Sequence, residues 1–149
     1  MTGLVLVTGA GGFIGGQLVR SLAERDVPVR AVDLKPLEHW FYRSERTENL
    51  VADLRDKACA FAATRGAGLV YNLAADMGGM GFIENHKALC MLSVLINTNL
   101  LMAAREHAVR RFFFASSACV YPDYRQNEDR KSTRLNSSHI QKSRMPSSA

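Results

Sequence analysis

Short hydrophobic runs alternate along this chain with longer segments whose apolar residues recur every three or four positions. A short apolar run bounded by glycine or polar residues is typical of a strand, whereas the wider spacing is typical of a helix with one buried face. We therefore expect strands at residues 3–8, 29–33, 49–52, 69–73 and 111–116, and helices at residues 13–25, 55–65 and 87–107. This alternation predicts right-handed crossovers and a parallel sheet.

The first predicted helix has an apolar stripe that we expect to pack on the sheet. Residues 34–48 are polar and aromatic and are interpreted as a loop, and a glycine-rich loop is expected at residues 74–86. The residues of the predicted stripe are Phe13, Ile14, Leu18, Val19 and Leu22.

The regular alternation ends after Tyr121, and this sets the expected domain limits. We expect residues 1–128 to form one α/β domain, a doubly wound parallel sheet that stops after about the fifth strand. Residues 129–149 contain six serines, no aromatic residue and no sustained periodicity. This composition predicts a disordered tail.

The formal charge of +5 is concentrated in that tail. Residues 129–149 hold five basic residues and one acidic residue, whereas residues 1–128 hold 14 basic and 13 acidic residues. The predicted domain is therefore nearly neutral, which argues against a nucleic-acid partner.

Membrane, export and metal signals are weak. The apolar run 90–104 is interrupted by polar residues and is too short to span a bilayer, and the chain starts without a signal-peptide pattern. Cys59, Cys90 and Cys119 are odd in number and lack metal-ligand spacing with the four histidines. We therefore expect a reduced, cytoplasmic protein without a metal site.

The sharpest motif is a glycine turn between the first predicted strand and helix, with glycines at positions 9, 12 and 15. Gly9 would allow the tight turn, Gly12 would let the backbone approach a pyrophosphate, and Gly15 would let the helix pack closely on the sheet. The N–H groups of the helix start would face the anion. The alternative is a glycine turn that binds no ligand.

Asp33 favours the ligand-binding interpretation. It ends the second predicted strand, 18 residues after Gly15, near the offset at which a carboxylate accepts hydrogen bonds from the adenosine ribose. A 2′-phosphate would meet its negative charge, so NAD is expected rather than NADP, although Lys35 places a positive charge nearby. The motif lacks the Gly-Lys-Ser/Thr ending of a P-loop.

The sequence Thr8-Gly-Ala-Gly-Gly-Phe-Ile-Gly15 resembles the extended short-chain dehydrogenase/reductase superfamily, and so do segments 52–56, 72–75 and 116–122. The resemblance implies a Rossmann-type fold with Asp53 near the adenine, Asn72 near the nicotinamide and an active-site serine at position 117. Separately, Asp53 could cap a helix, Asn72 could be a turn residue and the serines could simply end a strand. The implied cofactor-binding residues are Gly9, Gly12, Phe13, Ile14, Gly15, Asp33, Asp53, Leu54, Asn72 and Ala74.

Within this superfamily, segments 72–83 and 117–122 resemble the GDP-mannose 3,5-epimerase family. The resemblance implies a nucleotide-sugar substrate, GDP-mannose, that is transiently oxidised at C4 with NAD and then exchanges protons at C3 and C5. It implies substrate contacts at Gly78, Ser117, Ala118 and Cys119, with Ser117 and Cys119 catalytic. On residues alone, Cys119 is more often a buried small hydrophobe.

A general 4-epimerase or 4,6-dehydratase of nucleotide sugars would share the glycine turn and Ser117. It would not be expected to carry the Met-Gly-Gly-Met-Gly run at residues 77–81 or a cysteine at position 119.

The resemblance is expected to end near Asn127. The family continues to a Tyr-x-x-x-Lys pair, a second acid/base residue and a C-terminal substrate domain, none of which is expected in this chain. Residues 129–139 resemble a translated sequencing-library adapter, and the alternative is a natural basic tail. We therefore expect an NAD-binding part without turnover, and for the intact enzyme a homodimer, although the sequence leaves the oligomeric state open.

Overall fold

The computed structural model describes residues 3–75 and 87–116, and the side chains of residues 87–90 are not described. The chain divides into two compact units, Met1–Ala115 and Ser116–Ala149. Of the second unit, only the exposed residue Ser116 is described. The fold and the site below therefore concern the first unit.

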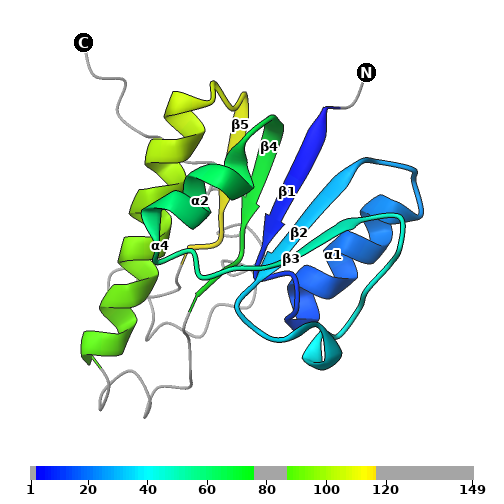
Figure 1. The fold of residues 1–149 in the computed structure, drawn as a ribbon, viewed down its shortest axis with the longest axis horizontal. Helices are drawn as coiled ribbons and strands as arrows, with labels where there is room; N and C mark the ends of the chain where they lie inside the picture. The colour runs from blue at the N-terminus through cyan, green and yellow to red at the C-terminus, as the bar shows by residue number, and fades with distance from the viewer. Residues whose placement is uncertain (1–2, 76–86, 117–149) are drawn as a thin grey trace, which may run out of the picture. The chain divides into compact units, whose positions relative to one another are not determined.

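The first unit is built on a parallel sheet whose strand order is β3-β2-β1-β4-β5 (Figure 1). The predicted doubly wound sheet is confirmed. Between β1 and β4 the order of the strands reverses direction, and such a switch point is where α/β sheets bind ligands. The strands are β1 (Leu4–Thr8), β2 (Val29–Asp33), β3 (Glu48–Val51), β4 (Ala67–Asn72) and β5 (Arg111–Phe114).

Helices cover both faces of the sheet. Neighbouring residues of a strand point to opposite faces, and the apolar residues of β1 therefore pack in two separate clusters. Val5 and Val7 of β1 pack in one cluster with Val19 of the first helix. Leu6 lies in the other cluster, with Ala60 and Leu100 of the opposite helices. The helices are α1 (Phe13–Ala23) on one face, and α2 (Lys57–Thr64) and α4 (Lys87–Glu106) on the other (Figure 1).

The predicted stripe of α1 is partly wrong. Phe13 and Ile14 are 66% and 72% exposed, whereas the buried positions of the helix are Gly15, Gly16, Val19 and Ala23. Because glycine has no side chain, Gly15 can pack closely against Gly9 and Ala10, and Gly16 against Phe41 and Tyr42. The larger apolar residues of the first helical turn are therefore left outside.

The remaining boundaries differ from the predictions by a few residues. The expected loop 34–48 contains a short 3-10 helix, η1 (Leu37–His39), and its last residue already belongs to β3. Helix α2 begins two residues later than expected, because the Asp56 side chain accepts hydrogen bonds from the backbone N–H groups of Ala58 and Cys59 and caps the helix.

Candidate nucleotide-binding site

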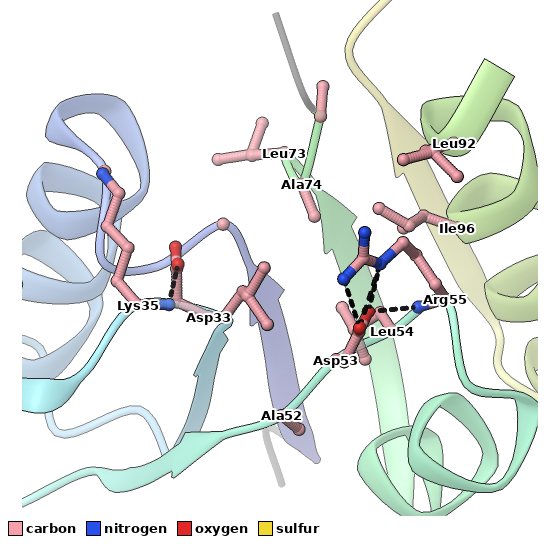
Figure 2. A pocket seen from close by; sticks show the side chains of 14 residues that line it. Asp33, Lys35, Ala52, Asp53, Leu54, Arg55, Leu73, Ala74, Leu92 and Ile96 are labelled. Carbon is pink, nitrogen blue, oxygen red and sulfur yellow. Dashed lines mark hydrogen bonds and ion pairs between the residues drawn. The ribbon is translucent and has the colours of Figure 1, made fainter. Parts of the chain in front are cut away.

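A pocket of about 320 Å³ lies at the carboxyl ends of the strands, where the sheet switches direction. Figure 2 shows Asp33 and Lys35 on one side of it and Asp53, Leu54 and Arg55 on the other. Four loops and one helix therefore supply its walls. The lining residues are Gly9, Gly12, Asp33, Leu34, Lys35, Ala52, Asp53, Leu54, Arg55, Leu73, Ala74, Ala75, Leu92 and Ile96.

The glycine turn contributes Gly9 and Gly12 to the pocket lining and leaves no room for a side chain at Gly9 and Gly15. Gly9 has a φ of +70°, and a Cβ atom there would lie 2.6 Å from the Leu73 carbonyl oxygen. A Cβ atom at Gly15 would collide with the carbonyl oxygen of Gly9. Gly9 is thus required by the turn, and Gly15 by the close approach of α1.

Gly12 differs from these two glycines. An added Cβ atom would be within 4 Å of only one atom outside its chain neighbours, the Gly9 carbonyl oxygen, at 3.3 Å. Gly12 nevertheless lines the pocket and precedes the first residue of α1. The N–H groups of Phe13 and Ile14 belong to the first helical turn, which has no intrahelical acceptors for them. The arrangement therefore suits a ligand phosphate close to the backbone.

Asp33 is held in place by backbone hydrogen bonds to both carboxylate oxygens. Its Oδ2 atom accepts from the N–H of Gly11 and its Oδ1 atom accepts from the N–H of Lys35, each at 2.9 Å. An ionised carboxylate has about four acceptor positions, so about two are not used by these two bonds, and Asp33 lines the pocket. This geometry is well suited to a pair of ribose hydroxyls.

The opposite wall is formed by the segment after β3. Arg55 binds the carboxylate of Asp53 through Nε and Nη2, with the shortest distance 2.6 Å. The hydrogen bond from the Arg55 side chain holds the pKa of Asp53 below its ordinary value. Asp53 does not cap a helix, because Asp56 caps α2.

Asn99 of α4 holds the backbone of this segment with its side-chain amide. Its side chain is 6% exposed, and its Nδ2 atom donates to the carbonyl oxygens of Leu54 at 3.2 Å and Arg55 at 2.9 Å. Leu92 and Ile96 of the same helix line the pocket. Helix α4 therefore both shapes the wall and fixes its backbone.

Asn72 lies beneath the pocket rather than in its wall. It is 2% exposed, its Oδ1 atom accepts from the Thr8 hydroxyl at 2.9 Å, and its Nδ2 atom donates to Asn97 at 3.2 Å. The Thr8 hydroxyl also accepts from the N–H of Ala74. Asn72 thus ties the ends of β1 and β4 together, as the last residue of β4 and not as a turn residue.

The structure brings together six of the ten predicted cofactor-binding residues as pocket lining: Gly9, Gly12, Asp33, Asp53, Leu54 and Ala74. Gly15 contributes through helix packing and Asn72 through the buried hydrogen bonds. The side chains of Phe13 and Ile14 point away from the core and are exposed. The predicted residues Gly78, Ser117, Ala118 and Cys119 lie outside the described residues.

Sequence reasoning missed several residues of the site. It assigned no role to Leu92, Ile96 or the supporting residue Asn99, and it included Arg55 and Ala75 only as members of the segments 52–56 and 72–75. Leu92 and Ile96 are one helical turn apart, so their periodicity on α4 was a usable signal. Nothing local in the sequence indicated the hydrogen bonds of Asn99, which span 45 and 44 residues.

Residues 3–75 and 87–116 are the part of the chain that the structure describes. No group of three or more histidine, cysteine, aspartate or glutamate side chains there could hold a metal ion. No helix in the described part of the chain has the length and hydropathy to cross a bilayer.

Comparison with known proteins places the site in context. The sequence profile of the NAD dependent epimerase/dehydratase family matches residues 5–144. GDP-mannose 3,5-epimerase 1 of Oryza sativa subsp. japonica is 44% identical over 125 residues, which are 83% of this chain and 33% of that protein. The chain thus spans about a third of the length of this relative. The matched range includes residues 129–144 of the predicted tail. That this tail does not belong to the family sequence stays a prediction.

Solved structures give the same grouping. The UDP-glucose 4-epimerase of Thermus thermophilus, in complex with NAD, aligns with a TM-score of 0.67 and 31% identity over 76% of this chain and 37% of that chain. A short-chain dehydrogenase/reductase superfamily protein of Agrobacterium tumefaciens with bound NAD aligns with a TM-score of 0.66 and 33% identity over 80% of this chain and 34% of that chain.

Proposed function

We propose that this chain, which belongs to the NAD-dependent epimerase/dehydratase family, binds NAD in the pocket described above. The observation that carries the proposal is the position of Asp33 beside the glycine turn. Its carboxylate is fixed by two backbone N–H groups and keeps acceptor positions for ribose hydroxyls. A 2′-phosphate in the same place would meet a negative charge, so NADP is expected to bind more weakly.

The residues present fit such a ligand. Gly12 leaves room for a pyrophosphate against the first turn of α1, and Asp33 suits the adenosine ribose. Leu54 and Ile96 offer apolar contacts to the adenine ring from the opposite wall. When bound, NAD would supply the hydride acceptor that the chain lacks.

Binding is tested by the melting temperature of the 149-residue chain at rising NAD concentration. A ligand at about a hundred times its dissociation constant stabilises the folded state by about 2.7 kcal/mol, so the melting temperature should rise steadily with NAD. A melting temperature independent of NAD would contradict the proposal.

We further propose that the chain is the nucleotide-binding part of a nucleotide-sugar epimerase that acts on GDP-mannose at C3 and C5. The identity of 44% with the rice GDP-mannose 3,5-epimerase supports this. The Met-Gly-Gly-Met-Gly run at residues 77–81 and Cys119 are its sequence support. In this proposal Gly78 and Ala118 contact the sugar, Ser117 binds the reacting sugar oxygen, and Cys119 exchanges protons at ring carbons.

Cys119 suits that role chemically. A thiol has an ordinary pKa of about 8.5, close enough to neutral pH to donate and accept protons when a neighbouring positive charge favours the thiolate. The 149 residues contain no Tyr-x-x-x-Lys pair to assist hydride transfer. We therefore propose that turnover needs the longer enzyme, and that this chain alone binds NAD without converting substrate.

The experiment uses the longer enzyme with its native continuation. GDP-mannose is incubated in heavy water, and deuterium at each ring carbon is followed by NMR. The Cys119→Ala variant should exchange C3 and C5 roughly 10²–10⁴-fold more slowly, because one positioned acid/base group is lost. Cys59→Ala is the matched control, since Cys59 lies on α2 outside the pocket lining, and it should exchange at the parental rate.

A second candidate function is a 4-epimerase of nucleotide sugars, favoured by the structural likeness to the Thermus UDP-glucose 4-epimerase. The same measurement separates the two candidates. Inversion at C4 of a UDP-sugar without solvent deuterium at C3 or C5 would favour the second candidate. Parental exchange in Cys119→Ala would make Cys119 a packing residue.

A further inference from the structure

The connection between β2 and β3 folds back onto the glycine turn. Trp40 is 9% exposed, although its neighbours His39 and Phe41 are exposed. Its ring belongs to the apolar cluster that contains Val7 and Ala10. A residue of a polar and aromatic connection is thus buried beside the glycine turn.

Trp40 contacts the turn at Gly11. A Cβ atom added to Gly11 would lie 2.8 Å from Cδ1 and 3.0 Å from Nε1 of Trp40. The indole Nε1–H donates to the carbonyl oxygen of Lys35 at 2.8 Å, and the N–H of Phe41 donates to the carbonyl oxygen of Gly11 at 3.1 Å. The connection therefore holds both the turn and the segment that follows Asp33.

Gly11 joins this contact to the ligand-facing carboxylate. Its carbonyl oxygen accepts from Phe41, and its N–H donates to Oδ2 of Asp33. The backbone N–H of Lys35 binds the other carboxylate oxygen. Trp40 consequently touches or bonds both residues whose N–H groups orient Asp33.

We infer that Trp40 is a positioning residue for the cofactor, which holds Gly11 and Lys35 so that Asp33 and the glycine turn have their binding geometry before the ligand arrives. The inference rests on the proposed function of NAD binding. A turn with several glycines has many alternative backbone conformations, and restricting them in advance lowers the entropy lost on binding. Trp40 does not line the pocket and acts only through its neighbours.

The first test compares variants by calorimetric titration of NAD and ADP, together with melting temperature. Trp40→Leu removes the ring and should weaken NAD and ADP binding equally, by about tenfold, which corresponds to the loss of roughly one hydrogen bond and its packing. Trp40→Phe keeps a ring against Gly11 but loses the N–H donor. Its affinity for NAD and ADP should therefore lie between those of the parent and of Trp40→Leu.

Leu37→Ala is the matched control. Leu37 lies in the same connection and packs against the same apolar cluster, but it is not a pocket-lining residue. It should lower the melting temperature while leaving NAD affinity unchanged. If Trp40→Leu lowered only the melting temperature, Trp40 would be ordinary core packing and the inference would be wrong. A parent chain that does not bind NAD would instead overturn the proposed function.

A double-mutant cycle tests the contact itself. Gly11→Ala should weaken NAD binding in the parent, because the new methyl group meets the indole and lies 3.0 Å from Cγ of Asp33. In Trp40→Leu the smaller side chain leaves more room, so the loss of affinity in the double variant should be less than the sum of the two separate losses. If the two losses of NAD affinity were strictly additive, Trp40 and Gly11 would not be coupled in NAD binding, and the inference would be contradicted.

The parent supplies a measurement that needs no variant, because Trp40 is the single tryptophan of the sequence. Its fluorescence should be poorly quenched by acrylamide both without NAD and with saturating NAD, as expected for a ring already packed. Strong quenching that disappears when NAD is added would show that the contact forms only with the ligand, and would overturn the inference.

Discussion

The two sides of the pocket are held in different ways. On the Asp33 side, formed by Gly9, Gly12 and Asp33, backbone groups fix the geometry: the positive φ of Gly9, the lack of room for a side chain at that residue, and two N–H groups that donate to the carboxylate of Asp33. On the Asp53 side, formed by Asp53, Leu54 and Arg55, side chains fix it. In its ion pair, the side chain of Asp53 is 36% exposed and that of Arg55 is 39% exposed.

The two sides of the pocket should therefore differ in their sensitivity to substitution. Where main-chain atoms lie close to a residue, as at Gly9, few other residue types can replace it, because the neighbouring main chain cannot move aside. An exposed ion pair contributes little, because water and salt screen it. The Asp53 side instead depends on the buried amide of Asn99. The Asp33 side should therefore be sensitive to substitutions in the glycine turn, and the Asp53 side mainly to substitution of Asn99 on α4.

The largest effect is expected at Gly9, and Gly66 is its matched control. Both have a positive φ, +70° and +76°, but a Cβ atom at Gly9 would lie 2.6 Å from the Leu73 carbonyl oxygen, whereas Gly66 has nothing within 4 Å. Gly66→Ala should cost about 1–2 kcal/mol of unfolding free energy from its φ alone. Gly9→Ala should cost clearly more and abolish NAD binding.

Urea denaturation of the two variants measures that difference, with NAD titration alongside. Equal losses of unfolding free energy at Gly9 and Gly66 would mean that the close approach to the end of β4 contributes nothing.

The next effect is expected at Asp33. In Asp33→Asn one carboxylate oxygen is replaced by an NH₂ group that faces a backbone N–H, and the negative charge is lost. NAD affinity should fall by about tenfold to a hundredfold, the range that corresponds to the loss of a hydrogen bond to a charged group. NADP should lose less, because the repulsion of its 2′-phosphate is removed. Asp26→Asn, at an exposed carboxylate beyond the end of α1, should leave both affinities unchanged.

A moderate effect is expected at Asn99. Asn99→Ala removes the donor to the carbonyl oxygens of Leu54 and Arg55 and should cost roughly 1–3 kcal/mol of unfolding free energy. NAD affinity should fall several-fold through movement of the Asp53 side. Thr98→Ala serves as the control, because its exposed hydroxyl bonds to Val94 of its own helix. If Asn99→Ala lost no more unfolding free energy and NAD affinity than Thr98→Ala, Asn99 would not support the Asp53 side.

The smallest effect is expected at Asp53. The hydrogen bond from Arg55 lowers the pKa of Asp53 in the folded protein, so ionisation favours the folded state. This contribution is present above the ordinary carboxyl pKa of about 3.9 and is lost as the pH falls through the lower folded value. At pH 7 the parent should have a slightly larger unfolding free energy than Asp53→Asn. The difference should disappear when the pH is below the folded-state pKa of Asp53.

Denaturation at pH 7 and at low pH measures the two contributions. A difference that grew as the pH fell would have the wrong sign for this ion pair.

The same contrast explains how much could be predicted from sequence. Gly9, Gly15 and Asp33 were predictable because the constraints on them are local: a turn, a close packing contact and the end of a strand. The five strands were predictable from short apolar runs. The family resemblance added Asp53 and Leu54, which line the pocket.

The failures have a physical cause as well. The predicted stripe of α1 included Phe13 and Ile14 because periodicity favours large apolar residues, but glycine backbone packs in their place. Asn99 and Trp40 act through contacts with segments distant in sequence or with backbone atoms. No pattern of residue types along the chain carries that information.

The Asp33 side is expected to recognise an unphosphorylated adenosine ribose. Calorimetric titration of the 149-residue chain with NAD and NADP, at one pH and one salt concentration, tests it most directly. We predict saturable binding of NAD with one site per chain, and weaker binding of NADP by about tenfold or more, as expected when a phosphate meets a fixed carboxylate. Equal or tighter binding of NADP would contradict the role of Asp33, and absence of NAD binding would contradict the site.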